Sequence, residues 1–292
     1  MKKLNVGASP IWDKKNWYTL DHKKRVGSED KSLLGDAGNI PLGGNTCSTI
    51  FTSHMFEHIP HVRLEKILLE FNRVLNVDGV LRILTPNLKR IAKAYVEEDI
   101  EFFNQAKLED ENIRTDLGFG GMFMNFVVSP GQDTALFNRN LSEFIAGYAH
   151  LYNYDFNMLK ILLERTGFYS VEQKGFCESS IEDYKEPLHV VGMQPIWKNF
   201  NQSFYKDNNL IHEYDPVEGV YNINFKVTGF DRDPLTSLIV EARKKETIDK
   251  TNHPNLNESS FNYNKYAWSL MKDSNFKDKC EVMLRAGKEY SG

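Results

Sequence analysis

The sequence predicts an α/β protein with a mostly parallel central sheet, and three observations support this prediction. Short runs rich in β-branched and aromatic residues alternate with segments of helical periodicity. The runs are separated by turn residues such as Gly, Pro, Asn and Asp. The chain has 292 residues, of which 41% are hydrophobic and 26% charged, a composition ordinary for one large globular domain with additions.

Strands and one clear helix are expected in the first ninety or so residues. The expected strands are residues 2–7, 17–21, 48–53 and 80–84. Apolar side chains recur every three or four positions from Val62 to Leu75, which predicts an amphipathic helix that the Asp78-Gly79 turn ends. Residues 8–16 are too few for an ordinary helical crossover, so the first helix is expected to be about one turn or absent.

The pattern becomes irregular after the fourth strand. Residues 88 to about 103 are expected to be helical. Residues 118–126 combine glycine with apolar side chains, and two interpretations stay open: a mobile cover over a site, or an irregular packing loop or subunit contact.

Regular elements are expected again from Asp155, which is a plausible helix N-cap, to Gly167, which ends that helix. Residues 168–174 are expected to form a strand and residues 178–216 to be irregular. Residues 220–228 and 235–242 are expected to be strands, joined as a hairpin through residues 229–234.

These elements suggest a main domain at residues 1–245, with an insertion at about 88–150 that acts as a lid or acceptor region. Residues 246–292 are a polar C-terminal extension, expected to be helical, whose role in docking or homo-oligomerisation stays open. Cys47, Cys177 and Cys280 are odd in number and widely spaced, so they are expected to be free thiols. With no signal-peptide-like or membrane-spanning run, a cytoplasmic location without a membrane partner is expected. The net charge of −4 gives no reason to expect a nucleic-acid partner.

Three candidate ligand-binding positions lie at or near the ends of successive expected strands. Gly7 permits a tight turn after the first strand, Asp21 ends the second, and Asp36 precedes the third. In an open α/β sheet, ligands bind outside the carboxyl ends of the strands. A carboxylate at Asp21 can accept hydrogen bonds from both ribose hydroxyls of a nucleoside.

The segments LNVGAS, NWYTLDH, GDAGNIPL, STIFTSHMFEHI, LLEFNRVLNVDGVLRILTPNL and HLYNYDFNMLKILLERTGF resemble the class I SAM-dependent methyltransferases of the methyltransferase type 11-like group. The resemblance implies a Rossmann-like fold with an antiparallel final strand, and S-adenosyl-L-methionine (SAM) as cofactor. It implies a small-molecule acceptor, or by analogy a saccharide-type acceptor. Its most specific part is His-Met-Phe-Glu-His followed by Arg73-Val74-Leu75.

The resemblance also assigns roles to residues. Those assigned to the cofactor are Gly7, Ala8, Asp21, Asp36, Ala37, Ser53 and His54. Gly7 would lie under the methionine part of SAM, Asp21 would hold the ribose, and Asp36 would contact adenine. His54 would lie beside the sulfonium and the acceptor, where it is a candidate catalytic residue.

A second group of candidates, His150, Tyr152 and Tyr154, would border the acceptor cleft. His150 is a candidate general base, because a histidine titrates near neutral pH. Tyr152 and Tyr154 are candidate substrate contacts. The alternative is that Asp155 caps the helix and the two tyrosines only pack.

Two departures leave other functions open. The glycine loop is Gly7-Ala8-Ser9-Pro10 and not Gly-x-Gly-x-Gly, which favours, as the main alternative, a catalytically inactive methyltransferase-like binding or assembly protein. His54-x-x-Glu57-His58 matches an inverted zincin pattern, in which two histidines bind zinc and the glutamate is the base of a hydrolase. No third ligand motif is evident, so no metal is assigned. Glu57 and His58 are instead expected to cap the helix start and pack near Arg73.

Overall fold

The computed structural model describes residues 1–8, 12, 14–21, 31–109, 117–128, 150–185, 211–215, 220–223, 230–233 and 235–248. By compactness the chain divides into a unit at Met1–Ile248 and a second unit at Asp249–Gly292. The second unit lies outside the described residues, so the helix expected in the C-terminal extension stays a prediction.

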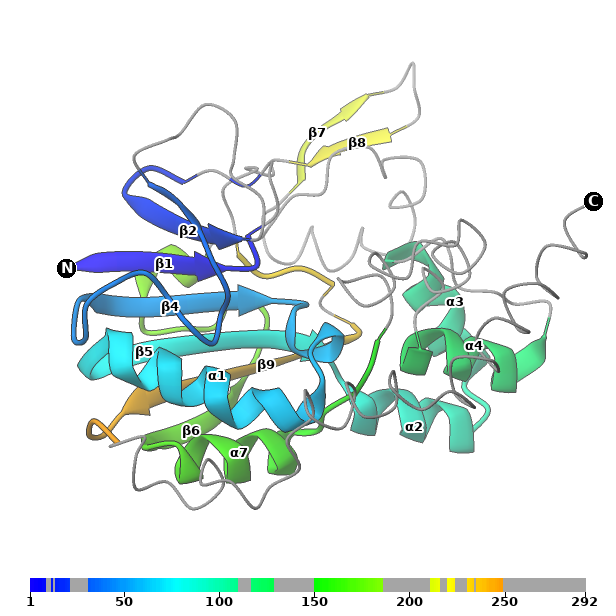
Figure 1. Cartoon of the computed structure of the whole chain (residues 1–292). Helices are drawn as coiled ribbons and strands as arrows, with labels where there is room; N and C mark the ends of the chain where they lie inside the picture. Colours follow the sequence, from blue (N-terminus) through cyan, green and yellow to red (C-terminus); the bar gives the residue numbers. More distant parts are fainter. Residues whose placement is uncertain are drawn as a thin grey trace, which may run out of the picture. The chain divides into compact units, whose positions relative to one another are not determined.

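The central sheet has seven strands: β1 (Lys2–Val6), β2 (Trp17–Asp21), β3 (Ser32–Leu34), β4 (Cys47–Ser53), β5 (Leu75–Pro86), β6 (Phe168–Lys174) and β9 (Ser237–Lys244). Their order is β3-β2-β1-β4-β5-β9-β6 (Figure 1). Strands β1 to β5 pair in parallel with one another, and β9 is antiparallel to both β5 and β6. The predicted mostly parallel sheet with an antiparallel final strand is therefore confirmed. The short strand β3 was not predicted.

The helices are η1 (Phe56–His58), α1 (His61–Val74), α2 (Leu88–Val96), α3 (Ile100–Glu109), α4 (Gly118–Val128), α7 (Phe156–Arg165) and η3 (Glu182–Lys185). The prediction that Asp78-Gly79 ends the first long helix was wrong, because α1 stops at Val74 and β5 begins at Leu75. The Asp155 carboxylate accepts a 2.8 Å hydrogen bond from the Met158 amide, which confirms it as the N-cap of α7.

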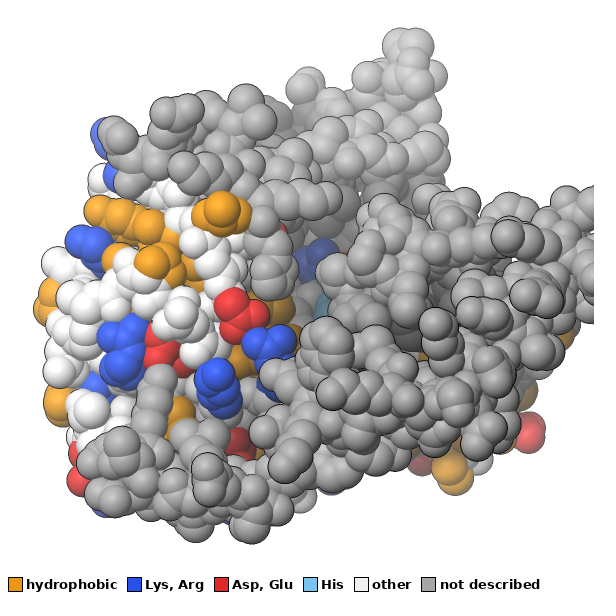
Figure 2. Space-filling model, viewed as in Figure 1, with side chains coloured by type: hydrophobic (Ala, Val, Ile, Leu, Met, Phe, Trp, Pro, Cys, Tyr) orange, Lys and Arg blue, Asp and Glu red, His pale blue; other side chains and the backbone are white. Residues whose placement is uncertain are grey.

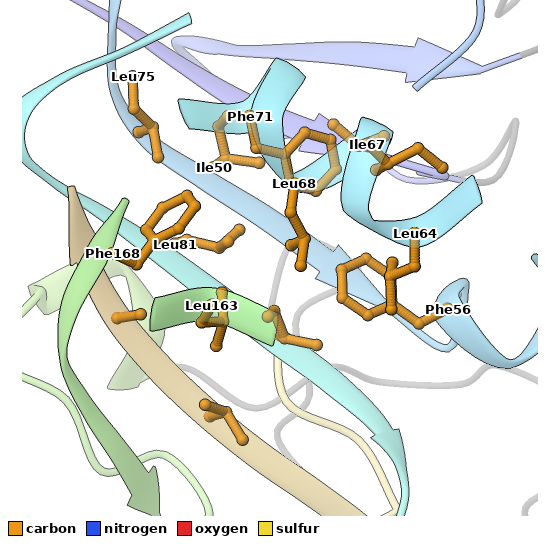
Figure 3. Close-up of a cluster of buried hydrophobic side chains, with 14 of the residues drawn as sticks. Ile50, Phe56, Leu64, Ile67, Leu68, Phe71, Leu75, Leu81, Leu163 and Phe168 are labelled. Carbon is orange, nitrogen blue, oxygen red and sulfur yellow. The ribbon is translucent and has the colours of Figure 1, made fainter. Parts of the chain in front are cut away.

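Helices α1 and α7 cover one face of the sheet (Figure 1). Leu64, Leu68 and Phe71 of α1, at the predicted three- to four-residue spacing, belong to one buried cluster with Ile50 and Leu81 of the sheet (Figure 3). All five side chains are fully buried. Each such burial contributes roughly 1.5–3 kcal/mol relative to exposure, so this apolar stripe stabilises α1 against the sheet.

An aromatic cluster covers the other face of the sheet. Trp17, Phe51, Tyr184 and Phe230 are buried there with ring centroids 4.7–6.0 Å apart. On the described part of the molecular surface drawn in Figure 2, acidic and basic side chains are interspersed with apolar ones.

The insertion differs from the prediction. The helix expected over residues 88 to about 103 is two helices, α2 and α3, separated where Glu98 adopts a positive φ of 51°. Residues 118–126 were expected to be irregular and lie within α4, because Met122 and Phe126 bury themselves against Phe103. Residues 129–149 of the proposed lid lie outside the described part of the chain.

The predicted hairpin through residues 229–234 was wrong. Strand β8 (Val220–Ile223) pairs with β7 (Ile211–Asp215) in a separate two-stranded sheet. Strand β9 instead pairs along its length with β5, because its alternating side chains are buried on both faces of the main sheet. Residues 178–216, expected to be irregular, contain η3 and β7.

Two further expectations concern thiols and membranes. Cys47 and Cys177 are free thiols as predicted, whereas Cys280 lies outside the described residues. Among the described helices, none has the length and apolar content that crossing a membrane requires.

Candidate functional site

A pocket of about 330 Å³ lies at the carboxyl ends of β1, β2 and β4. The strand order reverses between β1 and β4, which is the switch point where open α/β sheets bind ligands. The pocket is lined by Val6, Gly7, Leu20, Asp21, Gly35, Asp36, Ala37, His54, Met55, His58, Ile59, Pro60, Arg63 and Ile67. Five of the seven residues assigned to the cofactor from the sequence line it.

Gly7 and Asp21 lie side by side in the pocket wall because β1 and β2 are parallel neighbours. The Gly7 amide donates to the Leu20 carbonyl at 2.9 Å, and Gly7 has a φ of +76°, in the left-handed region that favours glycine. A Cβ at Gly7 would lie only 3.0 Å from Sδ of Met55. The glycine is therefore required both for the turn and for the close approach of Met55.

Asp36 and Ala37 follow β3 and line the pocket with Gly35. The Asp36 carboxylate accepts hydrogen bonds of 2.9 and 3.0 Å from Nη2 of Arg63, on the first turn of α1, and one of 2.8 Å from the Gly38 amide. The predicted adenine contact of Asp36 would have to share the carboxylate with Arg63, which the sequence interpretation did not identify.

Ala8 and Ser53 are the two assigned cofactor residues that do not line the pocket. Ala8 is buried in the aromatic cluster beside Trp12 and Trp17 on the opposite face of the sheet. Ser53 ends β4, and its Oγ is buried without a hydrogen-bond partner among the described residues. Neither position supports direct cofactor contact in this conformation.

His54 follows β4 with a positive φ of 48°, unusual for a residue that is not glycine. Its Nδ1 lies 3.0 Å from Oε1 of Glu57, and its Nε2 lies 2.9 Å from Oγ of Ser237 and 3.7 Å from Oδ2 of Asp233. The backbone turn and the contacts on both ring nitrogens fix the imidazole at the edge of the pocket.

Glu57 is fully buried in η1 and holds several segments together. Its Oε2 accepts a 3.1 Å hydrogen bond from Thr85 at the end of β5. Its backbone carbonyl accepts from the amides of Leu151 and Tyr152 at 2.6 and 3.2 Å. Burial raises the pKa of Glu57, but the hydrogen-bonding contact with His54 and the electrostatic interaction with the surrounding histidine rings outweigh it and lower the pKa to about 2. Glu57 is therefore a carboxylate at neutral pH.

His150 packs edge-on against His58, with ring centroids 5.0 Å apart. Its Nδ1 donates to the Phe126 carbonyl of α4 at 2.8 Å, because a carbonyl can only accept. Burial lowers the pKa of His150, and the nearby Glu57 charge opposes this only in part. His150 thus tends to be a neutral imidazole whose Nε2 carries the lone pair.

The two tyrosines assigned to the substrate have different environments. Tyr152 is 38% exposed and stacks on His61 with ring centroids 4.3 Å apart. Tyr154 is fully buried, its hydroxyl lies 3.4 Å from Nδ1 of His61, and burial raises its pKa. Tyr152 is therefore partly accessible but does not line the pocket, whereas Tyr154 packs.

The inverted zincin pattern is not supported by this geometry, because the segment is a short 3-10 helix and His54 is directed to Ser237 and Asp233. The interpretation that Glu57 caps a helix and packs near Arg73 was also wrong. Glu57 instead contacts His54 and Thr85, and Arg73 pairs with Glu70 at 2.8 Å.

The sequence interpretation missed Met55, Arg63, Asp233 and Ser237. The first two follow β4 and begin α1, next to residues already singled out, and could have been expected at the same sheet edge. Asp233 and Ser237 come from the start of β9, far along the chain. Only the antiparallel pairing of β9 with β5 brings them to His54.

Comparison with protein families matches residues 16–83 to the methyltransferase domain, about a quarter of the chain. The matched segment runs from β2 into β5 and contains Asp21, Asp36, His54 and Arg63. No curated protein matches the chain.

Solved structures with a similar arrangement include a SAM-dependent methyltransferase from Archaeoglobus fulgidus, 13% identical over 83% of this chain and 86% of that one, with a TM-score of 0.39. An S-adenosylmethionine-dependent methyltransferase from Mesorhizobium loti is 10% identical over 83% of this chain and 90% of that one, with a TM-score of 0.41. Sequence identities and TM-scores this low carry no information about the substrate of this chain.

The strand order, with the antiparallel strand β9 inserted between β5 and β6, and the family match agree on the class I SAM-dependent methyltransferase fold. The methyl donor of this class is SAM, and the open pocket lies where the cofactor of such a sheet binds.

Proposed function

We propose that this chain, a SAM-dependent methyltransferase by fold and family match, transfers the methyl group to a small-molecule or saccharide-type acceptor. The observation that carries the proposal is the position of His54, which shares the pocket wall with Gly7, Asp21 and Asp36. A basic imidazole thus lies at the edge of the cofactor pocket, where the acceptor must approach. A cytoplasmic location and homo-oligomerisation stay predictions.

The cofactor is proposed to lie across the carboxyl ends of β1 to β4. Asp21 would accept from the ribose hydroxyls, Asp36 and Ala37 would lie beside the adenine, and Gly7 would lie under the methionine part. The unfilled pocket argues against the alternative of an inactive relic, for which side chains would be expected to occupy this space.

His54 is proposed as the general base that accepts the acceptor's proton as the methyl group is transferred. Methyl transfer is an in-line displacement at the sulfonium, so the protein chiefly orients the two reactants and removes one proton. Ser237 and Asp233 contact Nε2 of His54 and would hold the imidazole in place until the acceptor displaces them from that nitrogen, which then takes the proton. His150 is the weaker candidate for the base, because it does not line the pocket.

The acceptor is proposed to approach past His54 and Tyr152. Tyr152 presents a partly exposed aromatic ring stacked on His61, suited to a small ring-shaped molecule with polar substituents. With acidic and basic side chains interspersed on the described surface of Figure 2, the proposal does not include a nucleic-acid acceptor.

Cofactor binding is tested by titrating S-adenosylhomocysteine into the full chain and into Asp21→Ala in a calorimeter. Asp21→Ala removes the two hydrogen bonds that the ribose hydroxyls would donate to the Asp21 carboxylate, which should weaken binding by roughly 10- to 100-fold. Glu164→Ala, an exposed carboxylate on α7 in an ion pair with Lys160, is the matched control and should bind as the natural chain does. Failure of the natural chain to bind at millimolar ligand would contradict the proposal.

The base is tested with His54→Gln, followed by release of S-adenosylhomocysteine in the presence of a panel of monosaccharides and small hydroxyl-bearing molecules. We expect kcat to fall by roughly 10²–10⁴-fold while S-adenosylhomocysteine affinity stays within a factor of about three. An unchanged kcat would exclude His54 as the base, but it would not contradict the proposed binding of the cofactor.

A further inference from the structure

Three side chains with metal-binding atoms converge beside the pocket from two distant parts of the chain. Glu57 and His58 lie in η1, and His150 lies in the segment before α7. One ligand atom from each lies within 4.8 Å of those of the other two. We propose that Glu57, His58 and His150 form a binding site for a divalent transition-metal ion, with Zn²⁺ as the best-fitting ion.

The donor set favours this class of ion. Two imidazoles and one carboxylate are the ligands of many catalytic zinc sites, whereas Mg²⁺ and Ca²⁺ prefer oxygen ligands alone. Ligand atoms that lie within 4.8 Å of one another can close on an ion at the usual distance of about 2.0–2.2 Å by small side-chain rotations.

The groups around the ligands are arranged as in a metal site. His150 donates from Nδ1 to the Phe126 carbonyl, which fixes the tautomer that leaves the Nε2 lone pair for a metal. Thr85 donates to Oε2 of Glu57, and His54 lies 3.0 Å from Oε1. Oε1 is buried, and because a carboxylate oxygen carries a second lone pair, its contact with His54 leaves a lone pair that an ion can accept.

This ligand set differs from the inverted zincin pattern of the sequence. That pattern needs His54 as a ligand, but both ring nitrogens of His54 already contact Glu57, Ser237 and Asp233. His150 takes its place and could not be found from local spacing, because it reaches Glu57 only through the backbone bonds of Leu151 and Tyr152.

Three protein ligands leave zinc a further coordination position for water or a substrate oxygen. His58 also lines the pocket, so the metal would border the space assigned to the cofactor and acceptor. Occupation of this position by an acceptor oxygen rests on the proposed function, whereas metal binding itself does not.

The test uses the full chain without a histidine tag, freed of metal by a chelator and titrated with ZnSO₄ against a chromophoric chelator. We expect one Zn²⁺ per chain. His150→Gln and His58→Gln should each weaken binding by roughly 100-fold or more, because each removes one of three ligands. His61→Asn is the matched control and should stay within a factor of about three. His54→Gln, which removes a contact to the ligand Glu57, should weaken binding less than either ligand variant.

Further measurements separate metal binding from folding and from the proposed function. Glu57→Gln is left out of the test because it would disturb a fully buried group. Circular dichroism checks that the two histidine variants, His58→Gln and His150→Gln, fold. Visible spectra of bound Co²⁺ without a thiolate band would support the N/O ligand set and exclude Cys177 as the source of binding.

Absence of stoichiometric zinc binding, or equal binding by the natural chain and His150→Gln, would overturn the inference. Equal loss in His54→Gln would replace it by the inverted zincin arrangement. S-adenosylhomocysteine titration of the same samples distinguishes the two proposals: cofactor binding without zinc binding rejects only the metal site, and zinc binding without cofactor binding rejects only the proposed function.

Discussion

At the scale of single residues, His54 concentrates the unusual features of the site. A residue with a Cβ at a φ of 48° is held there only when its surroundings over-determine it, and such outliers gather at functional sites. The backbone amide of His54 donates to the Leu84 carbonyl at 2.9 Å, so the turn begins directly at the end of the β4–β5 pairing. Because the backbone of His54 is fixed in this way, Ser237 and Asp233, which lie far away in the sequence, can orient its imidazole ring.

Ser237→Ala tests the role of that orientation. The variant removes the 2.9 Å contact with Nε2 of His54 and leaves Asp233 as the remaining partner. Because one hydrogen bond contributes about 0.5–1.5 kcal/mol, we expect kcat to fall roughly 3- to 10-fold. The KM for the acceptor and the affinity for S-adenosylhomocysteine should change little.

Ser48→Ala is the matched control, since its hydroxyl donates to the Lys2 carbonyl at the opposite end of β4. A Ser237→Ala variant that loses cofactor affinity, or keeps its kcat, would show that Ser237 is structural and does not position His54.

Four predicted cofactor residues that line the pocket share one property: each lies at or just after the end of a strand. Gly7, Asp21, Asp36 and His54 could be placed in one pocket because parallel strands bring their carboxyl ends to one edge. Asp233 and Ser237 could not, because the antiparallel pairing of β9 with β5 determines their positions. Ala8 was misplaced because the turn after β1 directs it to the opposite face.

At the scale of elements, the short helix η3 anchors a late segment of the chain to the first two strands. Asp183 of η3 accepts from Nζ of Lys3 in β1 and from Nε1 of Trp17 in β2, the latter at 3.1 Å. Burial raises the pKa of Asp183, but Lys3 and Trp17 outweigh this and lower it below its ordinary value of 3.8.

Asp183→Asn should therefore reduce the free energy of unfolding in a pH-dependent way. A lowered pKa in the folded state contributes stability above pH 3.8, and that contribution is lost as the pH falls through the folded-state pKa. We expect a loss of about 1 kcal/mol at pH 7, since Lys3 is partly exposed, and a much smaller loss near pH 3. Urea unfolding of both chains at a series of pH values measures the difference.

Glu182→Gln, whose carboxylate is largely exposed beside Lys185, is the control and should change the free energy of unfolding by less than about 0.5 kcal/mol. A constant difference between Asp183→Asn and the natural chain across the pH series would contradict the prediction.

Element existence was more predictable than element pairing. Both α1 and α7 could be predicted from the sequence, because each helix has one apolar stripe and α7 also has a recognisable N-cap residue. Helix α4 was missed because its apolar side chains are not confined to one face and its glycines lower helix propensity. Packing of Met122 and Phe126 against Phe103 outweighs that local preference.

At the scale of the molecule, a buried charge network connects the central strands with the segment that carries Asp233. Arg82 of β5 is fully buried, and its Nε donates to Asp231 at 2.9 Å. Its Nη1 donates to Glu241 of β9. Asp231 also accepts from the Cys177 amide at 2.7 Å. The network therefore fixes residues 230–233 against the sheet, and with them Asp233 beside His54.

Arg82→Met should destabilise the whole domain. The substitution keeps an apolar side chain of similar length but leaves the buried carboxylates of Asp231 and Glu241 without their cation. Removing one partner from a buried ion pair costs about 3–5 kcal/mol, so urea unfolding at pH 7 should show a loss of that order. Arg243→Met in the neighbouring strand β9 is the control. Its guanidinium is exposed and donates to the Asp78 carbonyl, so the substitution should cost less than about 1 kcal/mol.

The variant that combines Arg82→Met with Asp231→Asn and Glu241→Gln separates the cost of unpaired charge from the cost of lost contacts. Since no uncompensated charge stays buried, it should recover at least half of the lost free energy of unfolding. If the loss were due only to altered packing in β5, the combined variant would be no more stable than Arg82→Met. Recovered stability with a persistently lowered kcat would then show that the network also holds Asp233 in place for His54.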